Sequence, residues 1–186
     1  MSTGQGWAFC GQSRSEQELY MNNADKVYTA PRVLSANDIP TGVLTYLNGE
    51  NLLSKTQALR LSTVDSDGWP KAAFLTPGDI LALPNGSFRF AIFANSGTAA
   101  NLVRDGRLTL SMALDRGMCS LRMRAHKCNK GILELSLDIF EAKVERVRLH
   151  EAPYADVTSG ISFTLHEPSA VLARWQREIA ALRAVS

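Results

Sequence analysis

The sequence predicts a mainly β protein with flanking helices, in which short antiparallel strands form a small barrel. From residue 58 to about residue 150 the hydrophobic pattern has a period of two, which is typical of half-buried strands. Turn-forming residues separate neighbouring strand-like segments, so that consecutive segments are expected to form hairpins. Helical segments occur only at the two ends and once between the strands. This order excludes the regular alternation of a parallel α/β sheet and favours a barrel.

Composition limits the class of protein further. The chain has 186 residues, of which 45% are hydrophobic and 20% charged, as expected for one globular domain. The net charge of +2 is too small for the concentrated basic surface of a nucleic-acid-binding protein. No apolar run approaches the roughly 20 residues of a membrane helix. Three cysteines, Cys10, Cys119 and Cys128, have no disulfide-framework spacing, so we expect a cytoplasmic protein without nucleic-acid or membrane partners.

The N-terminal third contains little regular structure. Residues 1–33 are polar and weakly periodic and predict an N-terminal arm, and residues 34–186 predict a single domain. Residues 35–50 predict a short helix that Asp38 caps, with Pro40 in its first turn and Gly49 at its end. Residues 51–57 predict a second short helical piece.

The strands follow in pairs. Residues 58–64 and 69–76 form a predicted hairpin around the turn DSDG, and residues 79–83 and 87–93 form a second one around PNG. Residues 107–114 and 119–125 continue the sheet, and residues 133–150 predict one bent strand or two. The chain ends in a predicted helix over residues 168–184. Its apolar face comprises Val171, Leu172, Trp175, Ile179 and Leu182, and its polar face comprises Arg174, Arg177, Glu178 and Arg183.

The segment ANSGTAANLVRDG, residues 94–106, carries the best candidate site. It follows an apolar strand and predicts a short helix with Ser96 as N-cap and Gly106 as terminator. The start of a helix offers free N–H groups and a partial positive charge, Gly97 permits close approach, and Thr98 adds a hydroxyl. The segment is therefore either an anion site or only a helix cap. It has no cation of its own, and Arg60, Lys71 and Arg104 are the nearest ones in the sequence.

Several common sites are missing from the sequence. There is no G-x-G-x-x-G or G-x-x-x-x-G-K-[ST] phosphate loop, no H-E-x-x-H motif and no paired C-x-x-C motif. A metal site is therefore not expected, and no residue is singled out as catalytic.

Three motifs together resemble a known family. They are D-x-x-G-x-P (Asp65, Gly68, Pro70), S-x-T-x-x-N-L (Ser96, Thr98, Asn101, Leu102) and the run RDGRLTL that leads into the next strand. In their order and spacing, from about Lys55 to Phe163, they resemble the pyridoxamine 5'-phosphate oxidase-like family, whose members are split β-barrels that bind flavin mononucleotide (FMN).

The resemblance implies a homodimer with FMN in clefts at the subunit interface. It places the FMN phosphate on the turn after the fourth barrel strand and the flavin along two earlier strands. Carried onto this sequence, the implied cofactor-binding residues are Arg60, Leu61, Ser62, Thr63, Ala73, Phe74, Leu75, Thr76, Ser96, Gly97, Thr98 and Asn101. Arg122 and Arg124 either face the cofactor or the partner chain, or form a solvated strand face.

Two departures from the family pattern shape the functional expectation. The oxidases carry an S-R-K run where this chain has Ser96-Gly97-Thr98, and their C-terminal substrate-binding motifs are missing here. We therefore expect an FMN-dependent oxidoreductase that acts on an unidentified small molecule and not on pyridoxamine phosphate. The alternatives are a non-catalytic flavin store or sensor, and a split barrel that binds haem or a deazaflavin.

Overall fold

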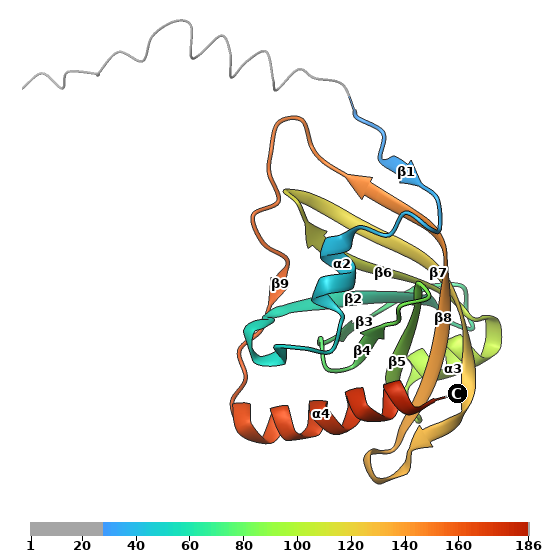
Figure 1. Cartoon of the computed structure of the whole chain (residues 1–186). Helices are drawn as coiled ribbons and strands as arrows, with labels where there is room; N and C mark the ends of the chain where they lie inside the picture. Colours follow the sequence, from blue (N-terminus) through green and yellow to red (C-terminus); the bar gives the residue numbers. More distant parts are fainter. Residues whose placement is uncertain (1–27, 186) are drawn as a thin grey trace, which may run out of the picture.

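The protein is built around one curled antiparallel sheet, as the sequence predicts. The computed structural model describes residues 28–185. Its nine strands have the order β3-β2-β6-β7-β8-β5-β4, with β1 paired to β8 and β9 paired to β2 (Figure 1). Their bounds are β1 Arg32–Leu34, β2 Gln57–Val64, β3 Pro70–Leu75, β4 Ile80–Ala82, β5 Ser87–Phe93, β6 Arg107–Leu114, β7 Gly117–Ile132, β8 Leu137–His150 and β9 Ile161–Ser162. Because β3 and β4 end this order, the barrel is split between them.

The first hairpin has the predicted turn chemistry. In β2 and β3, Leu59 lies opposite Leu75 and Val64 lies opposite Pro70. In the turn, the Asp65 carboxylate accepts hydrogen bonds from the backbone of Asp67 (3.0 Å) and Trp69 (2.8 Å). Gly68 has φ +87°, a conformation that glycine adopts without strain. The turn therefore fixes the register of the hairpin.

The period of two separates an inner face from an outer face. Along β2, Leu59, Leu61 and Thr63 are buried, whereas Arg60 and Val64 are exposed. The inner face joins the main core, whose largest fully buried side chains include Phe88, Phe90 and Phe140. Facing residues of paired strands point to the same side, so the outer face continues from β3 across β2, β6 and β7 to β8.

Helix α3, Gly97–Asp105, lies against one end of the barrel. The Ser96 hydroxyl accepts a hydrogen bond from Ala99 N (3.1 Å), and Gly106 ends the helix with φ +72°. Both predicted end signals are confirmed. The Asn101 amide donates to Thr63 Oγ1 (2.9 Å), which attaches the helix to β2.

The C-terminal helix α4, Pro168–Ala184, packs beneath the sheet (Figure 1). Trp175, Ile179 and Leu182 are buried in a second apolar cluster, as predicted. The prediction that Glu178 lies on the polar face is wrong, because its side chain is fully buried. The reason is a tertiary one: the helix passes over the loop between β3 and β4, where Asp79 and Thr76 supply a polar environment.

Smaller differences concern the ends of elements. Helix α2, Thr41–Tyr46, starts after Pro40, but Asp38 does not cap it; the Asp38 carboxylate instead accepts from Ser35 Oγ (2.7 Å). The predicted piece after α2 is the 3₁₀ turn η1, Leu52–Ser54. A second 3₁₀ turn, η2, Leu133–Leu135, precedes β8, which is a single strand.

Residues 1–27 of the expected N-terminal arm lie outside the described residues. The expected boundary after residue 33 falls within β1, where Val33 is paired with Arg148 of β8. In the described part of the chain, no helix is long and apolar enough to cross a membrane.

Candidate functional site

The candidate phosphate site lies where β5 ends and α3 begins. Phe93 is the last residue of β5, and the backbone turns back at Ser96, whose N–H donates to Phe93 O (3.0 Å). The first N–H groups of a helix have no partner within it and carry a partial positive charge. The Ser96 hydroxyl satisfies the N–H of Ala99, so the earlier N–H groups of this turn remain for a ligand.

Lys71 supplies a cation next to this turn, whose own segment of the sequence contains none. It lies in β3 opposite Thr63, and its Nζ reaches the backbone of Gly97 at the start of α3. A Cβ at position 97 would overlap Lys71 Nζ, so only glycine leaves this space free. The two residues are 26 positions apart in the sequence, and only the pairing of β3 with β2 brings them together.

The charges at this point are not balanced by the protein. The first turn of α3 contains no acidic residue, and no salt bridge among residues 28–185 includes Lys71. A cation beside the positive end of a helix is unfavourable by a few tenths of a kcal/mol to about 1 kcal/mol. A bound anion would relieve this repulsion. A turn with a purely structural role would gain no stability from a cation at this position.

Asn101 and Arg104 hold α3 in place. Asn101 is buried and bonded to Thr63, and its oxygen accepts from Arg104 Nη1 (3.1 Å). Arg104 Nη2 also donates to Val64 O. Arg104 is therefore engaged with the end of β2, and Arg60, the third cation considered, lies on the outer face of the sheet.

The twelve residues expected to bind the cofactor fall into separate groups. The turn residues Ser96 and Gly97 lie with Lys71, and Thr98 is buried directly behind them. Leu61, Thr63 and Leu75 point into the barrel and Ala73 is partly buried, so these residues could offer a ligand mainly their backbone. Arg60, Ser62 and Phe74 share the outer face, where Arg60 and Phe74 are paired. A flavin that contacts both the α3 turn and the outer face of β2 and β3 must cross the free edge of β3.

Thr76 belongs to a buried acidic cluster. Its N–H (2.6 Å) and hydroxyl (2.7 Å) both donate to Asp79 Oδ2. The carboxyl groups of Asp79 and Glu178 lie close enough to shift each other's pKa, and Arg174 Nε donates to Glu178 Oε1 (2.6 Å), whereas the buried Glu178 Oε2 has no hydrogen-bond partner among the described residues. Burial raises the pKa of both carboxyl groups, that of Glu178 to about 7, although Arg174 opposes the shift. With one guanidinium and two carboxyl groups, the cluster is neutral when it holds one proton.

The outer face of the central strands carries arginines that pairing brings together. Arg122 of β7 lies directly opposite Arg146 of β8, and Arg148 lies opposite Ser120. Like charges facing each other across strands are unfavourable. Sequence reasoning singled out Arg122 but not Arg146 or Arg148, because a register shift in β7–β8 decides which residues face each other.

Other chemistry is sparse in the described residues. Cys119 is buried in β7, and burial raises the pKa of its thiol to about 11, so it is not a reactive thiolate. Residues 28–185 contain no group of three or more His, Cys, Asp or Glu side chains that could hold a metal ion.

Comparison with known proteins decides the family. No family model matches the chain. The chain is 30% identical over 153 residues to the uncharacterized protein YclD of Bacillus subtilis (strain 168). The aligned region covers 81% of this chain and 99% of YclD. The chain belongs to the YclD family.

Solved structures resemble this YclD-family chain more distantly. A candidate pyridoxamine 5'-phosphate oxidase from Lactobacillus delbrueckii is 16% identical, covering 62% of this chain and 98% of its own, with a TM-score of 0.48. The haem storage protein HutZ from Vibrio cholerae is 10% identical, and the match covers 65% of this chain and 99% of HutZ, with a TM-score of 0.43. A haem-binding protein from Mycobacterium smegmatis is 16% identical, covering 73% and 61%, with a TM-score of 0.43. Likenesses this low carry no conclusion about the ligand of this chain.

Proposed function

We propose that this protein binds FMN, with the phosphate at the start of α3 and Lys71 as its counter-ion. The observation that carries the proposal is the position of Lys71 Nζ against Gly97, beside free helix N–H groups and without a carboxylate partner among the described residues. A phosphate takes up both kinds of donor at once, because it accepts hydrogen bonds and neutralises charge.

The strands next to this point suit the remainder of the cofactor. β3 is paired with β2 on one side and is the end of the sheet order, so its other edge offers backbone N–H and C=O groups. Phe74, 60% exposed, supplies an apolar surface on the outer side of this edge. When bound, FMN supplies hydride-transfer chemistry, and the chain contributes orientation and partial exclusion of water.

We infer further that the protein is a flavin-dependent oxidoreductase acting on a small molecule. Since the cofactor carries the redox chemistry, no nucleophile or general base is required of the chain. A flavin store would bind FMN in the same way without turnover. Oxidation of NADH or NADPH by the FMN-loaded protein, above the rate of free FMN, supports the enzyme, whereas its absence with every tested electron donor and acceptor supports the store.

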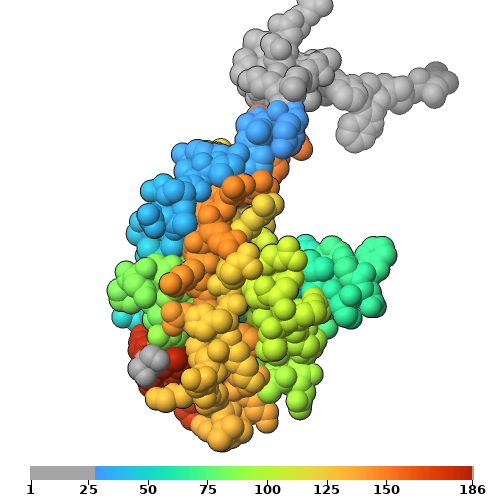
Figure 2. All heavy atoms as spheres, turned by 90° about the vertical axis from the view of Figure 1, so that its right-hand side faces the viewer, coloured from blue at the N-terminus to red at the C-terminus, as the bar shows by residue number. Residues whose placement is uncertain are grey.

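A homodimer is the assembly that the outer face supports best. The β2–β3 hairpin stands out from the body of the molecule (Figure 2). It exposes Trp69 (72%), Phe74 (60%) and Val64 (39%), which is unusually apolar for a free hairpin. Its turn carries Asp65 and Asp67, whose charges are complementary to the arginines on the outer face of β7 and β8. Two copies could therefore exchange these contacts about a two-fold axis.

The test of FMN binding is the variant Lys71→Gln, which removes the charge of the side chain, keeps it polar and shortens it by one atom. We expect FMN affinity to fall about tenfold or more, since hydrogen bonds to charged groups contribute about 1.5–3 kcal/mol. Without FMN, the variant should be slightly more stable than the wild type, because its repulsion with the helix N-terminus is gone. Binding is measured by quenching of flavin fluorescence and stability by urea unfolding.

Lys130→Gln is the matched control, since Lys130 is an exposed lysine of β7 without a salt bridge in the described part of the chain. Lys130→Gln should change neither the affinity for FMN nor the stability to urea. Wild-type protein that binds no FMN overturns the proposal, and a Soret band on addition of hemin would then favour the haem alternative. Equal FMN affinity of Lys71→Gln and the wild type would show that the phosphate lies elsewhere.

A further inference from the structure

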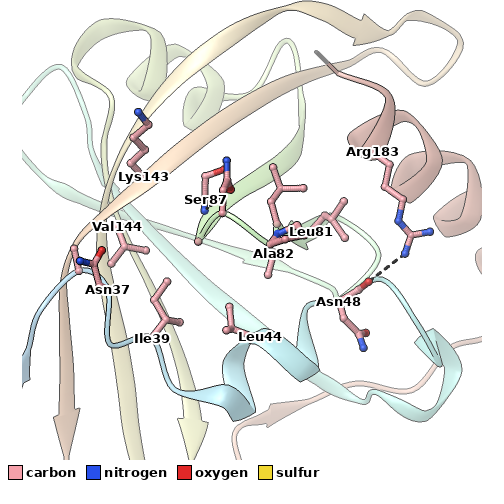
Figure 3. A pocket seen from close by; sticks show the side chains of 15 residues that line it. Asn37, Ile39, Leu44, Asn48, Leu81, Ala82, Ser87, Lys143, Val144 and Arg183 are labelled. Carbon is pink, nitrogen blue, oxygen red and sulfur yellow. Dashed lines mark hydrogen bonds between the residues drawn. The ribbon is translucent and has the colours of Figure 1, made fainter.

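A second cavity lies away from the candidate phosphate site. It has a volume of about 1080 Å³ and is enclosed by α2, the β4–β5 hairpin, β8 and the last turn of α4 (Figure 3). None of its lining residues belongs to the candidate cofactor site. The Ala82 N–H of β4 donates to Leu47 O at the end of α2 (2.8 Å), which holds two of its walls together. The volume is at the upper end of the range of about 300–1,000 Å³ for small-molecule pockets.

The middle of this cavity is apolar. Ile39, Leu44, Ala82 and Val144 are partly buried and pack against the main core, and Leu81 is 2% exposed. Their side chains lie next to one another between the strands and α2 (Figure 3). An apolar body of a ligand could therefore replace water along this surface, at about 25 cal/mol per Å² of apolar area removed from water.

The rim of the cavity is cationic. Lys143 and Arg183 lie on opposite sides of it (Figure 3), and no Asp or Glu is among the lining residues. Neither cation takes part in a salt bridge within the described residues.

Arg183 is nevertheless held in place. Its Nη2 donates to Asn48 O (3.2 Å), and a Cβ added at Gly49 would lie 3.1 Å from the same nitrogen, so glycine leaves the guanidinium its room. A positioned guanidinium without an acidic partner is suited to bind a carboxylate.

We propose that this cavity binds an organic carboxylate with an apolar body, the carboxylate group lying against Arg183 and the body against Ile39, Leu44 and Val144. Lys143 leaves β8 on the face opposite to Val144, so it adds positive charge at the rim without contacting the apolar floor. The proposal rests on charge complementarity and on the apolar floor beside Arg183. It is independent of FMN, because the two sites share no residue.

The experiment compares octanoate with 1-octanol, which has the same chain without the charge, by isothermal titration calorimetry on the full chain. Octanoate should bind at least severalfold more tightly than octanol. Arg183→Gln should weaken octanoate binding about two- to fivefold, the range of partly exposed charge pairs. Arg177→Gln on the same helix and Lys130→Gln are the matched controls and should leave it unchanged.

A second variant tests the floor without depending on the cations. Ile39→Glu places a carboxylate in the half-buried wall and should abolish octanoate binding, while circular dichroism and urea unfolding show that the fold is intact. The proposal is overturned if octanoate does not bind, if octanol binds equally well, if Arg183→Gln binds octanoate as the wild type does, or if Lys71→Gln removes octanoate binding. FMN titration of the same preparations tests the other site separately.

Discussion

Gly97 and Lys71 show how a glycine can be needed for space and not for its backbone conformation. Gly97 is the first residue of α3 and has ordinary backbone angles there, so glycine is not needed for the conformation. It is needed for space, because a side chain at this position would meet the end of Lys71. Since that end is flexible, the protein could accommodate a larger residue by moving the lysine away from the turn.

Gly97→Ala should therefore separate stability from binding. Alanine is favoured over glycine in helices, so the free energy of unfolding should stay the same or rise by up to about 1 kcal/mol. FMN affinity should fall about three- to tenfold, because Lys71 Nζ is displaced. Flavin fluorescence quenching and urea unfolding measure the two effects. Ala100→Gly on the exposed side of the same helix is the control and should lower stability without affecting FMN. A variant Gly97→Ala that binds FMN as tightly as the wild type contradicts the position assigned to the phosphate.

At the scale of elements, α4 shows what periodicity can and cannot predict. Its length and its apolar face of Trp175, Ile179 and Leu182 follow from the sequence, because these depend on local spacing. The burial of Glu178 does not, since it depends on Asp79, which lies 99 positions earlier in the sequence. The buried cluster also anchors Arg174, whose guanidinium lies over the Phe93 ring (5.4 Å), so that α4 contacts the strand that leads to α3.

The Glu178 carboxyl group makes the attachment of α4 depend on pH. Its pKa is raised from 4.5 to about 7 by burial, so the folded state holds a proton that the unfolded chain has released. The stabilisation from this proton is complete below about pH 4.5 and is lost as the pH rises through 7, by on the order of 3 kcal/mol. Glu178→Gln should flatten this part of the pH profile of urea unfolding, because the amide can donate to Asp79 and accept from Arg174. Glu134→Gln, at an exposed site, should retain the wild-type profile, and an unchanged profile for Glu178→Gln would exclude this role.

The contact between α4 and the β3–β4 loop allows a second test. Gly78 lies under the Trp175 ring, and a Cβ there would overlap the ring atoms. Gly78→Ala should therefore destabilise the protein by about 1–3 kcal/mol, the usual cost of overpacking. Gly68→Ala serves as a steric control, because nothing lies within 4 Å of its Cβ; its positive φ allows only a conformational cost of roughly 1 kcal/mol. Urea unfolding measures the stability of both variants. Equal losses of stability would mean that the Trp175 ring moves aside without cost.

For the whole molecule, hairpins could be predicted from the sequence and distant contacts could not. The turns DSDG and PNG and the signals around α3 are local, and the structure confirms the elements that they bound. The short strands β1 and β9 were missed because their two or three paired residues carry no pattern of their own. The sequence left open which of three cations lies next to the α3 turn. The register that places Lys71 opposite Thr63 brings Lys71 to this turn. A site assembled from several strands depends on such registers, which a single sequence does not contain.

The proposed dimer makes the stability of the whole molecule depend on protein concentration. If folding is linked to association, each tenfold rise in concentration adds about 1.4 kcal/mol per dimer, which corresponds to about 2 °C in the midpoint of thermal unfolding for chains of this size. Val64→Lys places a charge among the exposed apolar side chains of the β2–β3 hairpin, and should give a monomer by light scattering and remove the concentration dependence. Leu133→Lys, at a residue that is 90% exposed on η2, should leave both unchanged. A wild-type midpoint that does not depend on concentration, together with a monomeric mass, would show that the exposed hairpin serves another contact.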